Sequence, residues 1–321
     1  MSVLIIGGAG YIGSHTVKYF QDHNVDVVVL DNLSTGHREF VHVEHFYEGD
    51  CRDGQLLSEI FTNHDIEGVL HFAALSLVGI SMTDPYHYYH NNVYGALVLL
   101  EKMVEHGIKN IVFSSTAAVY GEPKQIPILE DDDTSPTNPY GETKLAMEKM
   151  MYWFEKAYGI HSVALRYFNA AGADEEGRIG EWHDPETHLI PLILQVPLGK
   201  RDAISIFGTD YPTKDGTCIR DYIHVTDLAN AHYLAYEYLK THETSDVFNL
   251  GNDQGFSVLE VIEMARKITG HPIQAIEEER RLGDPAVLVA SSEKAKNLLG
   301  WRPVFGLEEI IKSAWDFHKN R

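Results

Sequence analysis

The chain is poor in cysteine and in positive charge. Its 321 residues include two cysteines, Cys51 and Cys218, in unlike contexts and without a CxxC pair. This usage predicts a reducing, cytoplasmic location rather than a disulfide-stabilised fold. The formal net charge is -21, which argues against nucleic acid or an anionic membrane as a partner, because both require clustered cations.

Long apolar runs and metal-ligand spacings are also missing. No stretch approaches the ~18 apolar residues that a membrane helix needs, and the first apolar run is interrupted at Gly7 with no basic segment before it, so we expect no signal peptide. The 18 histidines show no HExxH or comparable spacing, so no metal site is predicted. At 44% hydrophobic residues, the chain can form roughly two domains with sizeable cores.

The stretch Ser2–Gly13, SVLIIGGAGYIG, predicts a strand, a tight turn and the beginning of a helix. Ser2–Ile6 is apolar and β-branched without alternation, which is typical of a central parallel strand buried on both faces. The glycines form G-x-G-x-x-G and the related G-x-x-G-x-x-G, the latter from Gly7, Gly10 and Gly13. This spacing lets the backbone approach a pyrophosphate and presents helix N-terminal amides to its charge.

The following segments give this turn a dinucleotide-binding context. A helix is predicted over 12–23 and a second buried strand over 25–30, which leads to Asp31. An acidic side chain there can bond a ribose 2′-OH and repels a 2′-phosphate, so NAD is favoured over NADP. Further strands, alternating with helices, are predicted at 46–48, 68–72, 110–115 and 162–167. The fold class is therefore α/β, a doubly wound parallel sheet of the Rossmann type.

The second half of the chain has a different sequence pattern from the first. We expect a dinucleotide-binding domain at 1–169 and a smaller mixed α/β substrate domain at 170–321, because a loop without periodicity begins near the boundary, and such long loops are usually functional. Helices are predicted at 85–106, 139–158, 189–198, 227–239, 258–269, 292–299 and 307–319. Short strands near 221–224 and 247–250 are candidates to return to the first sheet.

Three polar residues are expected to meet at the carboxyl ends of the strands, where open α/β sheets bind ligands. Thr116 follows a strand, and Tyr140 and Lys144 lie four apart on one helix face. A free tyrosine has a pKa of about 10, and a lysine ammonium and a nicotinamide ring beside it would lower that value and make the phenol a useful base. YxxxK alone occurs by chance on amphipathic helices, so the prediction depends on its combination with the glycine turn and Asp31.

These motifs together resemble the extended short-chain dehydrogenase/reductase family and, within it, the UDP-glucose 4-epimerases. The resemblance covers essentially the whole chain and is carried by GGAGYIG, the Thr116/Tyr140/Lys144 set, Tyr167-Phe168-Asn169, and the stretches 210–213 (DYPT), 216–222 (GTCIRDY) and 280–284 (RRLGD). It implies an isomerase that interconverts UDP-glucose and UDP-galactose through a 4-keto sugar with tightly bound, recycled NAD. It also implies a homodimer formed by the helices around 85–106 and 140–158.

The resemblance further implies which residues form the site. Tyr140, Lys144 and Thr116 are expected to be catalytic. The residues expected to bind NAD are Gly7, Gly10, Tyr11, Ile12, Gly13, Asp31, Asn32, Asp50, Cys51, Phe72, Ala73, Ala74, Asn91, Ser114, Tyr140, Lys144 and Tyr167. The residues expected to bind the UDP-hexose are Thr116, Asn169, His188, Leu189, Ile206, Phe207, Arg220, Arg281, Asp284 and Leu288.

Two positions depart from the common family pattern, and a third bears on the choice of sugar. Ser76 stands where many members have a lysine near the cofactor, and Ala74 replaces a frequent glycine. Leu288 stands at the position whose bulk admits or excludes an N-acetylated sugar in the family, and leucine is intermediate in size. UDP-N-acetylglucosamine therefore stays open as a substrate.

Three other kinds of function are weighed against this one. A nucleotide-sugar dehydratase of the same fold is disfavoured, because Ala117 and Ala118 follow Thr116 where the dehydratases have acidic residues. A uronate epimerase or decarboxylase would need an extra cation for the substrate carboxylate, and it stays open. A non-catalytic NAD-sensing protein is disfavoured by the presence of both Tyr140 and Lys144.

Overall fold

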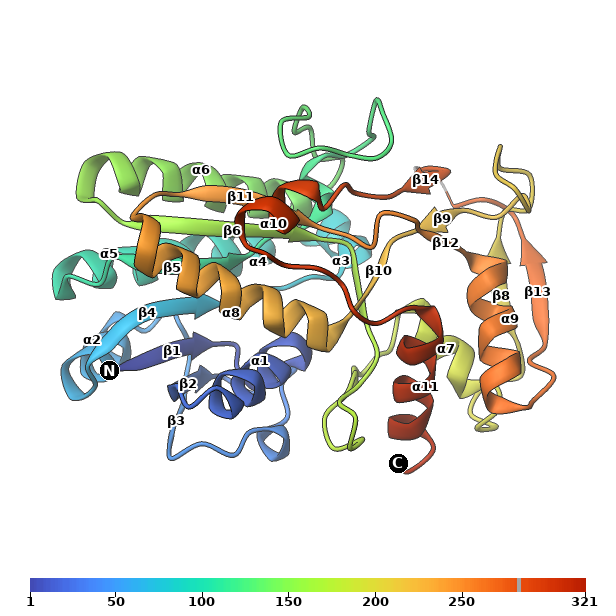
Figure 1. The fold of residues 1–321 in the computed structure, drawn as a ribbon, viewed down its shortest axis with the longest axis horizontal. Helices are drawn as coiled ribbons and strands as arrows, with labels where there is room; N and C mark the ends of the chain where they lie inside the picture. Colours follow the sequence, from blue (N-terminus) through green and yellow to red (C-terminus); the bar gives the residue numbers. More distant parts are fainter. Residues whose placement is uncertain (282–283) are drawn as a thin grey trace.

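A seven-stranded parallel sheet organises the chain (Figure 1). The structure, a computed structural model, describes residues 1–281 and 284–321. Across the sheet the strands are β11 (Asp246–Leu250), β6 (His161–Tyr167), β5 (Asn110–Ser114), β4 (Ile66–His71), β1 (Ser2–Ile6), β2 (Asp26–Asp31) and β3 (His45–Glu48). The chain winds outward from β1 in both directions, so a crevice forms at the carboxyl ends of the strands. The predicted fold class is confirmed.

Helices cover both faces of this sheet. One face carries α1 (Tyr11–Asp22) and α8 (Val225–His242), and the other carries α2 (Gly54–Asn63), α5 (Gly95–His106) and α6 (Pro139–Tyr158). Side chains of β1 alternate between the two resulting cores, with Val3 and Ile5 in one and Leu4 and Ile6 in the other. Burial on both faces explains why this strand is continuously apolar in the sequence.

The helix expected over 85–106 is interrupted. It consists of α4 (Pro85–Tyr88), a π-helical turn η2 (Tyr89–Tyr94) and α5, and a short helix α3 (Val78–Thr83) precedes it. The π-turn contains Asn92, whose buried amide bonds both the N–H and the carbonyl of Leu75 and the hydroxyl of Thr143. Such turns are frequent at functional sites, and the neighbouring Asn91 lines the cavity described below.

The remaining strands form small sheets beside the carboxyl ends of the main one (Figure 1). β7 (Asn169–Ala171) pairs with β10 (Tyr222–His224), β8 (Ile204–Phe207) pairs with β13 (Ala275–Glu278), and β9 (Ile219–Arg220) lies between β12 (Phe256–Ser257) and β14 (Val287–Leu288). The helices here are α7 (Leu189–Gln195), α9 (Val258–Thr269), α10 (Glu293–Leu298) and α11 (Leu307–His318), and the 3-10 turns of the chain are η1 (Arg38–Phe40) and η3 (Ala117–Val119). Helices α7, α9 and α11 share a third core.

The strand pairing in the second half of the chain differs in part from the one expected. Of the two strands that were candidates to return, β11 pairs with β6 in the main sheet, whereas β10 pairs with β7 outside it. The irregular loop therefore begins only after β7. The division of the chain at residue 169 stays a prediction. Over the residues that the structure describes, no helix combines the length and the apolar character needed to span a membrane.

Candidate functional site

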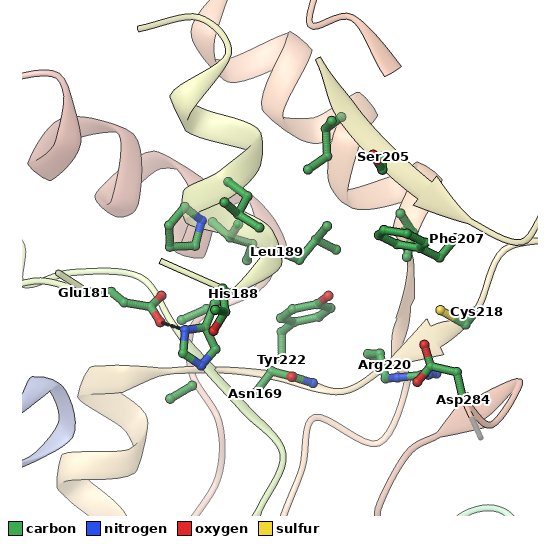
Figure 2. Close-up of a pocket in the computed structure, with 18 of the residues that line it drawn as sticks. Asn169, Glu181, His188, Leu189, Ser205, Phe207, Cys218, Arg220, Tyr222 and Asp284 are labelled. Atoms are coloured by element: carbon green, nitrogen blue, oxygen red, sulfur yellow. Dashed lines mark hydrogen bonds and ion pairs between the residues drawn. The ribbon is translucent and has the colours of Figure 1, made fainter. Parts of the chain in front are cut away.

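A large cavity runs along the carboxyl ends of the strands. It has a volume of about 1260 Å³, and a smaller hollow of about 350 Å³ adjoins it and shares part of its wall (Figure 2). The wall includes Ile6, Asp31, Ser114 and Tyr167, which end β1, β2, β5 and β6. One drug-sized ligand needs ~300–1000 Å³, so the combined space suits two adjacent ligands rather than one.

The cavity gathers nearly all of the residues expected in the site. Its wall contains all of those expected to bind NAD, and in addition Thr116, Asn169, His188, Arg220, Arg281, Asp284 and Leu288. Leu189 and Phe207 line the smaller hollow. Ile206 differs, because side chains alternate along β8 and Ile206 points into the third core with 4% of its surface exposed.

The glycine turn between β1 and α1 is packed too closely for other residues at two of its positions. A Cβ at Gly13 would lie 2.1 Å from the carbonyl oxygen of Gly7, and Gly7 has a φ of +80°. At Gly10 a Cβ would meet only that same oxygen, at 3.3 Å, so this glycine leaves its outer side open toward the cavity. Gly10 is also the N-cap of α1 and offers no side-chain cap, so the first-turn amides are available to an anion. The turn therefore fits a dinucleotide pyrophosphate.

Asp31 lies beside this turn at the end of β2. Its carboxylate accepts hydrogen bonds from the backbone N–H groups of Ala9 and Leu33, each at 2.8 Å. Burial raises its pKa. Because a carboxylate offers about four acceptor positions, it can still accept a bond from a ribose hydroxyl, which is the role that the sequence predicts.

The side chains expected at the adenine end also lie together. Asn32 donates a hydrogen bond of 3.1 Å to the carboxylate of Asp50, which forms an ion pair with Arg52. The hydrogen bond from Arg52 lowers the pKa of Asp50 to about 2. The neighbouring Cys51 is buried, and burial raises its pKa to about 12. An ionised carboxylate here is an acceptor for an adenine amino group.

Thr116, Tyr140 and Lys144 meet on the cavity wall, as expected. Lys144 lies one helical turn after Tyr140 on α6, with its Nζ 6.0 Å from the centroid of the Tyr140 ring. That ammonium donates a hydrogen bond of 2.7 Å to the carbonyl oxygen of Ser114. Thr116 follows β5, and its hydroxyl accepts a bond of 3.2 Å from the N–H of Ala118.

The charges of this trio differ from the expectation. Burial raises the pKa of Tyr140 to about 12, and a hydrogen bond with Thr116 lowers it by less. Burial also lowers the pKa of Lys144 to about 7, against the opposing effect of Glu148. The protein groups by themselves therefore leave the pKa of the phenol above its usual value, because the effect of burial exceeds that of the Thr116 hydrogen bond and the ammonium is bonded to Ser114. A further positive charge beside the phenol is needed to make it a base near neutral pH.

A buried ion pair behind the trio was not predicted. Arg166 forms two hydrogen bonds with Glu148, at 2.6 and 3.0 Å, and both side chains are more than nine-tenths buried. Ser115, next to Thr116, donates a hydrogen bond to the same carboxylate. The only signal in the sequence was the four-residue spacing between Lys144 and Glu148, which is common on exposed helix faces.

The side chains expected around the UDP contact one another in pairs. Arg220 donates a hydrogen bond of 3.0 Å to Asp284 (Figure 2), and the guanidinium of Arg281 lies 3.8 Å from the centroid of the Phe207 ring. Two arginines in the wall of a strongly acidic chain suit a diphosphate, which guanidinium groups bind bidentately. Residues 282 and 283 of the 280–284 motif lie outside the described residues.

Comparison with known proteins assigns the family. Residues 3–251 match the NAD dependent epimerase/dehydratase family. The chain belongs to this family. It is 61% identical over 320 residues to the UDP-glucose 4-epimerase of Halalkalibacterium halodurans, an alignment that covers 99% of the chain and 96% of the relative. It is 56% identical over 322 residues to the UDP-glucose 4-epimerase of Lacticaseibacillus casei, and this alignment covers 100% of the chain and 97% of the relative.

Solved structures agree with this assignment. A crystal structure of a UDP-glucose 4-epimerase superposes with a TM-score of 0.98 at 54% identity, covering 100% of this chain and 98% of that one. The UDP-glucose 4-epimerase of Brucella ovis in complex with NAD superposes with a TM-score of 0.96 at 46% identity, covering 98% of this chain and 97% of that one. The UDP-glucose 4-epimerase of Bifidobacterium longum in complex with NAD+ and UDP superposes with a TM-score of 0.94 at 38% identity, covering 100% of this chain and 98% of that one. The predicted resemblance and the predicted NAD dependence are confirmed.

Proposed function

We propose that the protein interconverts UDP-glucose and UDP-galactose, using a firmly held NAD that is reduced and reoxidised within one turnover. One observation carries this proposal: a single cavity joins the glycine turn to Tyr140, Lys144 and Thr116 and then to Arg220 and Arg281. A dinucleotide and a sugar nucleotide can therefore lie end to end with the phenol between them. The relatives that are UDP-glucose 4-epimerases, among them one that is 61% identical, support the choice of reaction.

In this proposal residues 1–169 hold NAD and residues 170–321 hold the UDP. The first-turn amides of α1 bind the pyrophosphate, Asp31 and Asn32 bind the adenosine ribose, and Asp50 and Cys51 lie at the adenine. When bound, NAD accepts the hydride of the sugar C4, returns it, and places a positive ring beside Tyr140. That charge is the one that the pKa of the phenol requires, since burial alone raises it to about 12.

The chain's own groups move the proton and hold the sugar. The phenolate of Tyr140 removes the proton of the 4-OH as the C4 hydride leaves, and it returns the proton when the hydride comes back. Thr116 bonds the same oxygen. For the product to be the C4 epimer, the 4-keto sugar must turn over between the two steps. Arg220 and Arg281 hold the diphosphate during this turn.

One assay tests both the reaction and the cofactor. Purified protein is incubated with UDP-galactose and no added NAD, and UDP-glucose is measured. We expect product from the wild type, none from Tyr140→Phe with bound NAD retained, and wild-type turnover from Tyr158→Phe, an exposed tyrosine at the far end of the same helix. Absence of product from the wild type, even with NAD supplied, would favour the NAD-sensing alternative, and an active Tyr140→Phe enzyme would exclude the phenol as the base.

We also infer that two copies of the chain pair through α5 and α6. These adjacent helices expose large apolar side chains, among them Leu97, Tyr152 and Trp153, the last with 66% of its surface exposed. Contiguous exposed apolar surface of this kind marks an interaction site. Light scattering should give twice the chain mass for the wild type and the mass of one chain for Trp153→Asp. The control is Leu298→Asp, which changes an exposed leucine on α10 and should keep twice the chain mass. A monomeric wild type would refute this pairing.

A cytoplasmic location is the third part of the proposal. Its support is that Cys51 and Cys218 are both buried and unpaired among the described residues, as is usual in a reducing compartment. Thiol titration of unfolded protein purified without reductant should give two free thiols per chain, and a value near zero would contradict this location.

A further inference from the structure

The loop between β7 and α7 brings two carboxylates and two imidazoles together. Glu181, His183, Glu186 and His188 each offer one donor atom, and these atoms all lie within 4.8 Å of one another. The proposed epimerase reaction gives no role to the first three of these residues. Their spacing, E-x-H-x-x-E-x-H, is not the HExxH pattern, so no metal site is expected from the sequence.

The distances between these donors are near those around a tetrahedral ion. His188 Nδ1 lies 2.9 Å from Glu181 Oε1 and 3.0 Å from Glu186 Oε1. His183 Nδ1 lies 3.5 Å from Glu181 Oε1 and 3.7 Å from Glu186 Oε2. Ligands ~2.0–2.2 Å from a tetrahedral Zn²⁺ are ~3.3–3.6 Å apart. The two His188 distances must therefore lengthen by roughly 0.3–0.7 Å for these groups to bind one ion.

One nitrogen in the cluster makes no hydrogen bond to any residue that the structure describes. His183 Nδ1 is a buried atom, and its contacts with the carboxylate oxygens of Glu181 and Glu186 are longer ion-pair distances of 3.5 and 3.7 Å. A buried polar atom without a partner costs free energy. A cation placed between His183 and the carboxylates of Glu181 and Glu186 would remove this cost, because the nitrogen lone pair would then point at the ion.

The charge of the cluster must be balanced within it. The carboxylate side chains of Glu181 and Glu186 are only 5% and 7% exposed, and the ion pairs that they form within the described part of the chain are with His183 and His188. Burying two carboxylates is costly unless positive charge balances them, and one divalent cation supplies the charge that two protonated imidazoles would otherwise supply. The N–H groups of Thr187 and His188 donate to Glu186 at 2.7 and 2.8 Å, which fixes its orientation.

From this geometry we infer that Glu181, His183, Glu186 and His188 bind one zinc ion per chain. Two imidazoles and two carboxylates in a tetrahedron suit Zn²⁺ better than Mg²⁺ or Ca²⁺, which prefer six or more oxygen ligands. Four protein ligands leave no open position, so the site is structural. The ion would hold the loop in place at two points. Glu181 and His188 form one edge of the smaller hollow (Figure 2). The ring of His183 contacts the ring of Tyr11 in the glycine turn edge-on, with 6.3 Å between the ring centroids.

Zinc content and thermal stability test this site. Protein stripped with a chelator is dialysed against buffered ZnCl2 and analysed for metal, and its melting temperature is recorded with and without zinc. We expect one zinc per chain and a higher melting temperature for the wild type. His183→Ala and Glu181→Gln should weaken zinc binding at least ~10–100-fold, the effect of losing an outer-shell partner. His87→Ala, at an exposed histidine that also faces a carboxylate, should bind as the wild type does.

Cobalt provides a test that does not depend on any variant. Co²⁺ added to the stripped wild type should give the strong visible absorption of tetrahedral coordination. Two results would overturn the site: less than about 0.1 zinc per chain at saturation, or equal zinc affinity in the His183→Ala and His87→Ala variants. The cluster would then consist of protonated imidazoles paired with the two carboxylates. Neither readout requires turnover, so failure here is distinguishable from failure of the epimerase proposal.

Discussion

The ammonium of Lys144 bonds the carbonyl oxygen of Ser114 at 2.7 Å and not the phenol of Tyr140. Its Nζ stays 6.0 Å from the centroid of the Tyr140 ring, so its charge can reach the phenol only through space. Burial lowers the pKa of Lys144 to about 7 and raises that of Tyr140 to about 12. At pH 7 the phenol is therefore neutral and the lysine is about half protonated, and the positive charges around the phenol decide whether it can act as a base.

Replacing Lys144 with methionine should slow turnover and shift its pH dependence to higher pH. A nearby opposite charge lowers a pKa by ~1–3 units, so loss of the ammonium reduces the phenolate fraction and kcat near pH 7 by about 10–1000-fold. The measurement is kcat against pH for Lys144→Met beside Lys149→Met, which removes an exposed lysine from the same helix. A Lys144→Met profile that is lower but unshifted would show that the lysine does not act through the pKa of the phenol.

A histidine near Lys144 makes the protein sensitive to acid. His71 is 1% exposed, neither of its ring nitrogens has a hydrogen-bond partner among the residues that the structure describes, and burial lowers its pKa to about 3. Between pH 6.5 and 3 the unfolded chain binds a proton there that the folded chain does not. The free energy of unfolding therefore falls as the pH falls through this window, by about 2 kcal/mol between pH 7 and 5 for this one group.

His71→Phe should remove this part of the acid sensitivity. The free energy of unfolding is measured by urea denaturation at pH 7 and pH 5 in both proteins. We expect the variant to lose about 2 kcal/mol less than the wild type between these pH values. His87→Phe, at an exposed histidine, is the control and should keep the wild-type difference. An unchanged pH dependence in His71→Phe would mean that His71 is protonated in the folded protein.

The parts of the site that the sequence predicted are those encoded by short segments. Ser2–Ile6 is apolar because both faces of β1 are covered, and Gly13 is glycine because a Cβ there would strike the turn itself. Tyr140 and Lys144 share a face because one helix turn separates them. In each case the cause lies within a dozen residues, so the pattern is visible in the printed chain.

The parts that were not predicted depend on contacts across the fold. Arg166 meets Glu148 only because β6 lies against α6, and burial, which no pattern reveals, determines the pKa of Lys144. β10 was a candidate for the main sheet but pairs with β7, because β11 occupies the place beside β6. The cluster around His183 depends on the path of an irregular loop, for which periodicity gives no information.

The ion pair between Arg166 and Glu148 should be important for stability. Arg166→Met leaves the buried carboxylate of Glu148 without its partner, and breaking a buried pair in this way costs about 3–5 kcal/mol. Urea denaturation of the variant should show this loss, and a double variant that adds Glu148→Gln should recover part of it. Lys124→Met breaks an ion pair whose side chains are 83% and 77% exposed and should leave the midpoint unchanged. Equal midpoints for Arg166→Met and the wild type would mean that water reaches the pair.

Leu288 should set the choice between plain and N-acetylated sugars. It ends β14 and lines the large cavity, half-buried, so a smaller side chain there would leave space for an acetamido group. Leu288→Ala should raise the ratio of kcat/KM for UDP-N-acetylglucosamine to that for UDP-glucose by about 10–200-fold, the range for small changes in an apolar pocket. Leu288→Ile, which conserves volume, should shift this ratio much less. If the ratio is the same in all three proteins, another part of the wall contacts the substituent at C2.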